Sequence, residues 1–251
     1  MGDGVSARQR VTAFWDEAVR GWLDSSPLDV RLRQWQAAYS GRGDGAVQAD
    51  AMPEPFIGPF ALGRDPAMVM LGLNPGGADL TFQGTGGVFT DTVERVGYTE
   101  WASSAPYTSE AWEGTHGRNR YHRSRAAFAS RFLAADVTPA DLLYVELFPW
   151  HSIKVTGSMQ PTPEVLAEFV WEPLAECDVA QVFAFGAPWL TSGAAVGTAP
   201  GRELQVSWRS GGRSAHVFPL PSGQDLIVVK QSGYAGPPGA HDTEALREAL
   251  G

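Results

Sequence analysis

Cysteine is almost absent from this sequence, because Cys177 is the only one among 251 residues. A single cysteine excludes an internal disulfide, a zinc site built from several cysteines and an iron–sulfur cluster. No apolar run approaches the roughly 20 residues that a membrane-spanning helix needs. The first residues, "MGDGVSARQR", lack the apolar segment of a secretory signal. These absences predict a cytoplasmic protein that does not enter the membrane.

Acidic residues are also missing from one window of an otherwise acidic chain. The formal net charge of −9 argues against indiscriminate coating of nucleic acid. From Thr115 to Ala135, however, there is no Asp or Glu, and this window holds Arg118, Arg120, Arg123, Arg125 and Arg131. With Tyr121 and His122 between them, these arginines suit phosphate contact and stacking. The alternative is a solvated helix start whose arginines pair with acids elsewhere, but so many arginines without acids favour phosphate contact.

Hydrophobic periodicity predicts alternating helices and strands. Helices are expected over residues 6–24 and 27–39, within an N-terminal extension of residues 1–45, and again over 122–135, 162–177 and 241–250. Buried strands are expected over 67–73, 141–149 and 179–190, and a hairpin or two successive strands over 216–233. Residues 75–120 read as a long structured loop with short helical turns. This alternation predicts an α/β fold whose mostly parallel sheet has helices on both faces.

The predicted strands end in polar and glycine residues. In open α/β sheets, ligands bind at the carboxyl ends of the strands. The first strand is followed by Asn74-Pro75-Gly76-Gly77, the second carries Glu146, Pro149, Trp150 and His151, and the last carries Lys230, Gln231, Ser232 and Tyr234. Taken alone, "GLNPGG" is also ordinary turn chemistry, and it matches neither Gly-x-Gly-x-x-Gly nor a P-loop.

Together these pieces resemble the uracil-DNA glycosylase superfamily over most of residues 60–250. The matching stretches are "GLNPGG", "QGTGGVF", "LLYVELFP", "VFAFGAPW" and the last strand with its closing helix. The resemblance implies one domain over residues 1–251, a three-layer α/β/α sandwich with a mainly parallel four-stranded sheet. It implies that Asn74 holds the water that attacks the sugar and that Phe89 stacks on the flipped base. The implied base pocket contains Gly72, Leu73, Pro75, Gly76, Gly77, Phe89, Glu146 and Trp150.

The sequence departs from the family at the end of the last strand. There the family usually has His-Pro-Ser, whereas "KQSGYAG" places Gln231 and Ser232 at that point. Either the departing base is held less firmly, or His151 or His216 stabilises it from another strand. Tyr234 is expected to press into the duplex as an aromatic wedge, or to pack over a rigid turn. The expected DNA contacts are Arg118, Arg120, Tyr121, Arg123, Arg125, Lys154, Lys230 and Tyr234.

A second departure concerns the base itself. The family reads uracil with an Asn, whereas a carboxylate at Glu146 only accepts and so suits the exocyclic amine of cytosine. The alternative is that Glu146 is a structural ion-pair partner. Some bacterial members of the superfamily remove glucosylated 5-hydroxymethylcytosine from phage DNA. In the loop of residues 79–119, Trp101, Tyr107 and Trp112 could wall a pocket for such a base. The carboxylates of Glu110 and Glu113 could bind the hydroxyls of its sugar.

The sequence therefore predicts a monomeric, monofunctional DNA glycosylase that needs no metal or cofactor and acts on a modified pyrimidine. One alternative is a uracil or mismatched-thymine glycosylase of base excision repair. Another is a non-catalytic DNA-binding module on the same fold. A hydrolase triad is disfavoured, since His151 and Ser152 are merely adjacent and Gly-x-Ser-x-Gly is missing. A metal site is disfavoured too, since His116, His122 and His151 lack ligand spacing.

Overall fold

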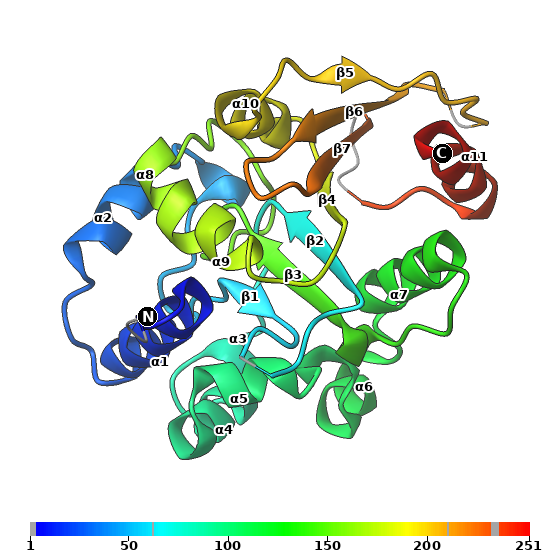
Figure 1. Cartoon of the computed structure of the whole chain (residues 1–251). Helices are drawn as coiled ribbons and strands as arrows, with labels where there is room; N and C mark the ends of the chain where they lie inside the picture. Colours follow the sequence, from blue (N-terminus) through cyan, green and yellow to red (C-terminus); the bar gives the residue numbers. More distant parts are fainter. Residues whose placement is uncertain (1–3, 62, 210, 232–235) are drawn as a thin grey trace. The chain divides into compact units, whose positions relative to one another are not determined.

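The computed structural model of the chain describes residues 4–61, 63–209, 211–231 and 236–251 (Figure 1). The chain divides into two compact units, each built from three separate segments. The first unit comprises residues 1–65, 74–106 and 145–177, and the second comprises residues 66–73, 107–144 and 178–251. The residues expected to form an N-terminal helical extension, 1–45, share the first unit with two later segments.

The predicted α/β character is confirmed, but the sheet is larger than expected. Within the described residues, seven strands form a mixed sheet in the order β1-β3-β2-β4-β7-β6-β5, not the four expected strands (Figure 1). They are β1 (Phe56–Ile57), β2 (Met68–Gly72), β3 (Leu142–Glu146), β4 (Gln181–Phe185), β5 (Arg202–Glu203), β6 (Arg213–Pro219) and β7 (Asp225–Gln231). In the second unit β2, β4 and β7 are parallel neighbours, whereas β6 and β5 run antiparallel.

The second unit shows why its strands form where the sequence predicts them. Every residue of β2 is buried, as expected of a parallel strand covered on both faces. The strands β6 and β7 are the predicted hairpin, joined at the turn around Pro221-Ser222-Gly223 with Pro219 opposite Asp225. The helices of this unit are α6 (Glu110–His116), α7 (Arg120–Leu133), α10 (Pro188–Val196) and α11 (Ala240–Leu250), with the 3-10 turn η3 (Pro139–Asp141).

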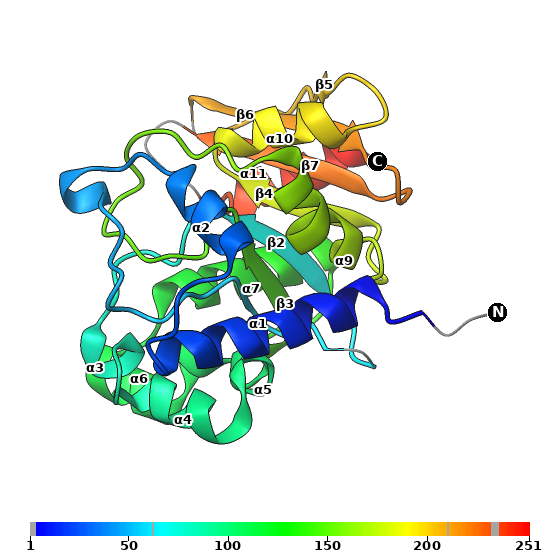
Figure 2. The same cartoon turned by 90° about the vertical axis from the view of Figure 1, so that its left-hand side faces the viewer.

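The first unit is mostly helical. Its helices are α1 (Ala7–Leu23), α2 (Val30–Ala37), α3 (Leu80–Gln83), α4 (Val88–Val96), α5 (Tyr98–Ser103), α8 (Pro163–Leu166) and α9 (Glu172–Leu174), with the 3-10 turn η1 (Gly43–Gly45) and the π-helical segment η4 (Ala167–Trp171). A further 3-10 turn, η2 (Pro106–Thr108), lies at the boundary of the units. The region predicted as a loop with short helical turns thus contains several short helices. Figure 2 shows α1 lying alongside α4 and α5, which it contacts. None of the described helices is long and apolar enough to cross a membrane.

Local capping explains where α1 and α8 begin. Ser6 and Gln9 form a capping box at the start of α1, in which each side chain bonds the backbone N–H of the other residue. Thr162 caps α8, and Pro163 occupies the first helical position as predicted. Along α1, Val11, Trp15 and Val19 are buried at four-residue spacing, so one face of the helix turns inward.

Most of the tryptophan side chains lie in the hydrophobic core. Five of the nine tryptophans, Trp15, Trp35, Trp101, Trp150 and Trp189, are at most 2% exposed. In the first unit Trp35 stacks on Phe169 at 5.4 Å, meets Trp15 at 6.1 Å and donates from Nε1 to the Leu147 carbonyl. These rings therefore fill the interior of their units and are covered by protein.

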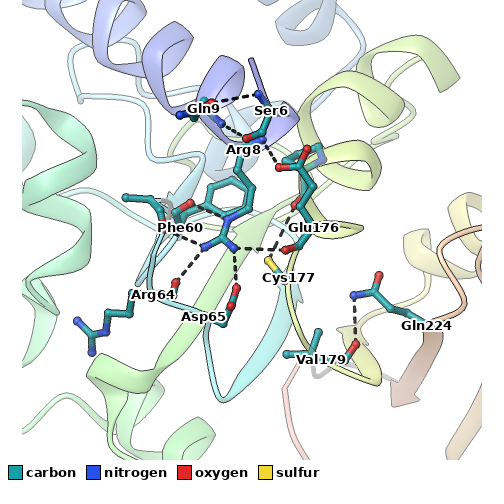
Figure 3. A network of polar contacts seen from close by, with 12 residues as sticks. Ser6, Arg8, Gln9, Phe60, Arg64, Asp65, Glu176, Cys177, Val179 and Gln224 are labelled. Atoms are coloured by element: carbon teal, nitrogen blue, oxygen red, sulfur yellow. Dashed lines mark hydrogen bonds and ion pairs between the residues drawn. The ribbon is translucent and has the colours of Figure 1, made fainter. Parts of the chain in front are cut away.

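Arg8 is a buried cation that ties the first helix to two distant segments (Figure 3). Its guanidinium donates to the carbonyl oxygens of Phe60, Ala61 and Arg64, and to Asp65 Oδ1 at 2.6 Å. The Glu176 carboxylate accepts the N–H groups of Ala7 and Arg8 at the start of α1. Burial would raise the pKa of Glu176, but these backbone donors hold it below its usual value.

The neighbouring Cys177 is not a reactive thiol. Burial raises its pKa to about 11, so the thiol remains protonated at neutral pH. Only the thiolate is a strong nucleophile, so this buried thiol is a poor nucleophile at neutral pH.

Replacing Arg8 by Met should lower the free energy of unfolding by about 3–5 kcal/mol, since several buried carbonyl groups lose their donor while the aliphatic stem is kept. Arg10→Met is the matched control, because Arg10 is 55% exposed and its guanidinium bonds the exposed carboxylate of Glu172 and the Val5 carbonyl. Its effect should stay below about 1 kcal/mol. Urea unfolding followed by tryptophan fluorescence measures both, and equal effects would contradict the structural role of Arg8.

Candidate functional site

The turn from Asn74 to Gly77 begins two residues after the end of β2. Gly76 has φ +88°, a conformation that side-chain-bearing residues rarely adopt. A Cβ built at Gly76 would meet no atom within 4 Å, so its backbone angle, and not lack of space, calls for glycine. A Cβ at Gly77 would make ordinary contact with Ile153 at 3.5 Å. The predicted turn is therefore present and presents bare backbone.

The Asn74 side chain has a fixed orientation. Its Nδ2 donates to the Ser152 carbonyl at 3.1 Å and to Ser152 Oγ at 2.9 Å. A carbonyl oxygen only accepts, so the amide nitrogen must face Ser152 and Oδ1 must face away. Oδ1 accepts no hydrogen bond from any described residue, and the side chain is half-buried. Asn74 therefore offers one oriented acceptor, as a water-holding amide requires.

Residues 48, 151 and 152 hold the turn from behind. The Gly76 carbonyl accepts from the Ser152 N–H at 3.1 Å and lies 3.1 Å from His151 Nδ1. Gln48 accepts from the Ala78 N–H through Oε1 and donates its own N–H to the His151 carbonyl. Two chain segments thus fix the conformation of a glycine-containing turn that would otherwise be pliable.

His151 lies behind this turn and does not line an open surface. Its side chain is 1% exposed, and Nε2 lies 3.4 Å from Oε1 of Glu54, which is itself 2% exposed. Both ring nitrogens therefore face protein atoms. This placement is contrary to the expectation that His151 contacts the departing base directly.

Glu146 is buried at the last position of β3, where its N–H donates to the Pro55 carbonyl. It shares its surroundings with Glu54 and the phenol of Tyr98. Burial, and then the charge of Glu54 with a smaller effect of Glu146, raise the pKa of Tyr98 well above its usual value. Tyr98 therefore stays protonated and donates to the Phe56 carbonyl at 2.6 Å.

Sequence reasoning missed Glu54. A signal was available, because Glu54 is the only charged residue in "AMPEPFIGPF" and all of residues 51–60 are buried. A carboxylate in such a run needs partners in the fold, since burying a charge alone is costly. Its partner, His151, follows a strand that comes much later in the sequence, and no local pattern connects the two.

The aromatic residues expected to line the base pocket are enclosed by other side chains. Phe89 is 3% exposed in α4, with its ring centroid 5.0 Å from Phe82 and 5.2 Å from Trp101. Trp150 is 2% exposed and meets Trp35 edge-on at 6.0 Å. Stacking of a base on either ring would require the neighbouring side chains to move.

The remaining residues around the turn are placed as follows. The Gly72 carbonyl, at the end of β2, accepts from Trp189 Nε1 at 2.9 Å. Leu73 and Pro75 are half-buried on either side of Asn74. Lys154 is exposed, and its Nζ pairs with Asp44 Oδ2 at 2.8 Å. Lys154 therefore already has an acidic partner.

The predicted arginine window lies in the second unit, around the start of α7, and its arginines differ in environment. Arg118 and Arg120 are exposed and form no hydrogen bond or ion pair with any described residue. Arg123 binds the Glu113 carboxylate through two oxygens at 2.7 and 2.8 Å. Arg125 is 3% exposed and lies 3.3 Å from the ring centre of Tyr121, so it supports that ring. Arg118 and Arg120 are thus the arginines best placed to meet phosphate.

The aromatic residues expected to wall a sugar pocket are divided between the units. Trp101 is buried in the first unit. In the second unit Tyr107 stacks on His122 and meets Trp112 edge-on, and Trp112 stacks on His116 at 3.8 Å. Glu110 is exposed. Glu113 is held by Arg123, whose hydrogen bonds lower the pKa of that carboxyl below its usual value.

The end of the last strand is only partly described. Lys230 is exposed on β7 and His216 is half-buried on β6. Gln231 closes β7, while Ser232 and Tyr234 lie outside the described residues. Among the residues that the structure describes, no group of three or more His, Cys, Asp and Glu side chains is placed to hold a metal ion.

Comparison with known proteins returned no relatives. No protein-family model matches the sequence, no curated protein matches it, and no solved structure matches the chain.

The His122→Phe variant should be less acid-sensitive than the wild type. Burial first, and then Arg125, lower the pKa of His122 from 6.5 to about 3. The unfolded chain takes up this proton near 6.5 and the folded protein does not, so stability is full above that pH and is lost as the pH falls toward 3. Between about pH 6.5 and about pH 5 the loss is about 2 kcal/mol, which the variant should avoid.

Urea unfolding at the two pH values measures this difference, and Phe keeps the stacking with Tyr107. His116→Phe, at an exposed histidine, is the control and should behave as the wild type. Equal acid sensitivity of the His122 variant and the wild type would contradict the depressed pKa.

Proposed function

We propose that this protein is a monofunctional DNA glycosylase that hydrolyses the N-glycosidic bond of a flipped base and leaves an abasic site. The orientation of the Asn74 amide carries this proposal. Two bonds to Ser152 hold Nδ2 and leave Oδ1 as an acceptor directed away from them. Such an acceptor can position one water for attack without adding a charge beside the sugar.

The chemistry of the reaction suits this arrangement. As the bond to the base breaks, positive charge develops on the sugar and negative charge on the departing base. A donor directed at the base stabilises the negative charge. The N–H groups of Gly76 and Gly77 donate to no described residue, and both glycines leave room for close approach. The turn would therefore supply both groups that the reaction needs. Asn74 Oδ1 would hold the water, and the N–H groups of Gly76 and Gly77 would donate to the departing base.

The base is proposed to be a modified cytosine, such as the glucosylated 5-hydroxymethyl form. Glu146 supports this choice, because a buried carboxylate accepts from the exocyclic amine of cytosine and cannot donate to a uracil oxygen. The proposal includes the three-layer arrangement of the uracil-DNA glycosylases, for which the parallel neighbours β2, β4 and β7 are partial support. It also includes a monomeric state and binding of Arg118 and Arg120 to phosphate.

A DNA-binding module without catalysis is the second candidate. The position of His151 favours it, because the imidazole is enclosed and does not replace the missing His of the last motif. Turnover separates the two candidates, since a binding module has no need of an oriented water.

Truncating Asn74 should slow base excision by at least about 10²-fold and leave DNA affinity nearly unchanged, because the amide acts on the water and not on the phosphates. Oligonucleotides would carry uracil, thymine opposite guanine, cytosine, 5-hydroxymethylcytosine or its glucosylated form, with abasic sites revealed by alkali. Gln160→Ala removes an exposed amide from the same unit and is the matched control.

Cleavage of the glucosylated base alone, lost in Asn74→Ala, supports both the enzyme and the role of Glu146. Cleavage of uracil supports glycosylase activity but contradicts the role proposed for Glu146 in recognising cytosine. DNA binding by both proteins without product from any substrate would overturn the catalytic proposal in favour of the binding module.

Replacing Arg118 and Arg120 together by Gln should weaken DNA binding similarly for every sequence. The slope of log K against log salt should fall by about 2, because each arginine neutralises one phosphate and releases its counterion. Fluorescence anisotropy over a range of salt concentrations measures this slope. Arg33→Gln, at an exposed arginine of α2, is the control, and an unchanged slope in the double variant would exclude phosphate binding by this pair.

A further inference from the structure

The peptide group between Gly76 and Gly77 has a defined direction. Its carbonyl accepts from the Ser152 N–H and faces His151 Nδ1, both at 3.1 Å. In a planar trans peptide the C=O and the following N–H point in opposite directions. The Gly77 N–H must therefore point away from residues 151 and 152, and no described residue accepts it.

This direction is not guaranteed by the turn alone. Glycine on both sides of the peptide widens the range of accessible backbone angles, so the 76–77 peptide can rotate at small steric cost. Rotation would bring the Gly76 carbonyl oxygen to the place where the N–H now points. An oxygen there would repel a departing base that is gaining negative charge. The donor therefore depends on the groups that hold the carbonyl inward.

His151 and Glu54 determine how firmly that carbonyl is held. A carbonyl only accepts, so the proton of the imidazole must lie on Nδ1. Nε2 then faces Glu54 Oε1 at 3.4 Å, with both side chains at most 2% exposed. A proton held between Nε2 and Oε1 would relieve the repulsion between two acceptors in such a buried place and would leave Nδ1 to donate to the Gly76 carbonyl. In this arrangement Glu54 keeps the imidazole ring in the form that carries a proton on Nδ1, and Nδ1 donates to the Gly76 carbonyl.

We propose that Glu54 and His151 are positioning residues that keep the 76–77 peptide turned so that the Gly77 N–H donates to the departing base. Neither side chain touches the substrate in this scheme, since both lie behind the turn. The inference rests on the proposed glycosylase activity and assigns His151 a different role from the direct one expected from the sequence.

Single-turnover excision by four variants tests the catalytic part. His151→Phe removes the ring donor and should slow excision by about 10²–10³-fold, the usual cost of losing one such donor. Glu54→Ala should also be slow. Glu54→Gln should recover most of the rate, because its amide can donate to Nε2 and keep the proton on Nδ1. His241→Phe, at a 59% exposed histidine, should match the wild type. DNA affinity should stay unchanged in all four.

Crystal structures and nitrogen NMR of the imidazole test the positioning part without any substrate. In the wild type and Glu54→Gln, His151 should carry a proton on Nδ1 and the Gly76 carbonyl should face inward. In His151→Phe, that carbonyl should face outward or occupy two orientations.

The proposal is overturned if His151→Phe keeps an inward carbonyl and a wild-type rate, or if Nδ1 of the wild-type ring is unprotonated. If the wild type excises no base, the proposed function fails, and the structures and spectra still decide whether the pair holds the peptide. Should His151→Phe not fold, Glu54→Ala and Glu54→Gln provide the same comparison.

Discussion

The candidate site depends on the hydrogen bonds that Ser152 forms with residues of the Asn74–Gly77 turn. Ser152 donates its N–H to the Gly76 carbonyl, and its carbonyl and hydroxyl oxygens accept from Asn74. The residue is fully buried, so these bonds form away from competing water. Ser152 therefore fixes the face that the Asn74 amide presents and, together with His151, holds the direction of the adjacent peptide.

The elements of this fold were largely predictable because their signals are local. Buried apolar runs gave the strands now seen as β2, β3 and β4, a Pro-Ser-Gly turn gave the hairpin of β6 and β7, and a Thr-Pro pair gave the start of α8. The shortest elements were predictable only in part. The two-residue strands β1 and β5 are too brief to show a period, and for the helices α3 to α6 the sequence predicted short helical turns within a loop without their bounds.

The candidate site was predictable only in part. Asn74, Gly76 and Gly77 stand out because a strand ending in an amide and glycines is readable in one stretch of sequence. Their support comes from Glu54, His151 and Ser152, which are joined to the turn by contacts between distant segments. Arg8 shows the same limit, because its main acceptors are backbone carbonyls, which no residue type identifies.

Side-chain type also says little about exposure. Arg125 belongs to a window that suggests phosphate contact, yet it is buried beneath Tyr121, whereas Arg118 and Arg120 in the same window are exposed. Phe89 likewise fits a stacking role by motif and lies within an aromatic cluster. Packing decides which members of a recognisable pattern are available to a ligand.

The binding of an abasic-site analogue tests the central claim most directly, because it does not require the base to be known. Duplexes would carry either a cationic azasugar, which mimics the charge of the reacting sugar, or a neutral tetrahydrofuran at the same position. A glycosylase should bind the azasugar DNA at least about 10²-fold more tightly, as enzymes bind mimics of the transition state. Asn74→Ala should lose most of that preference. Equal affinity of the wild type for the two duplexes would contradict the account.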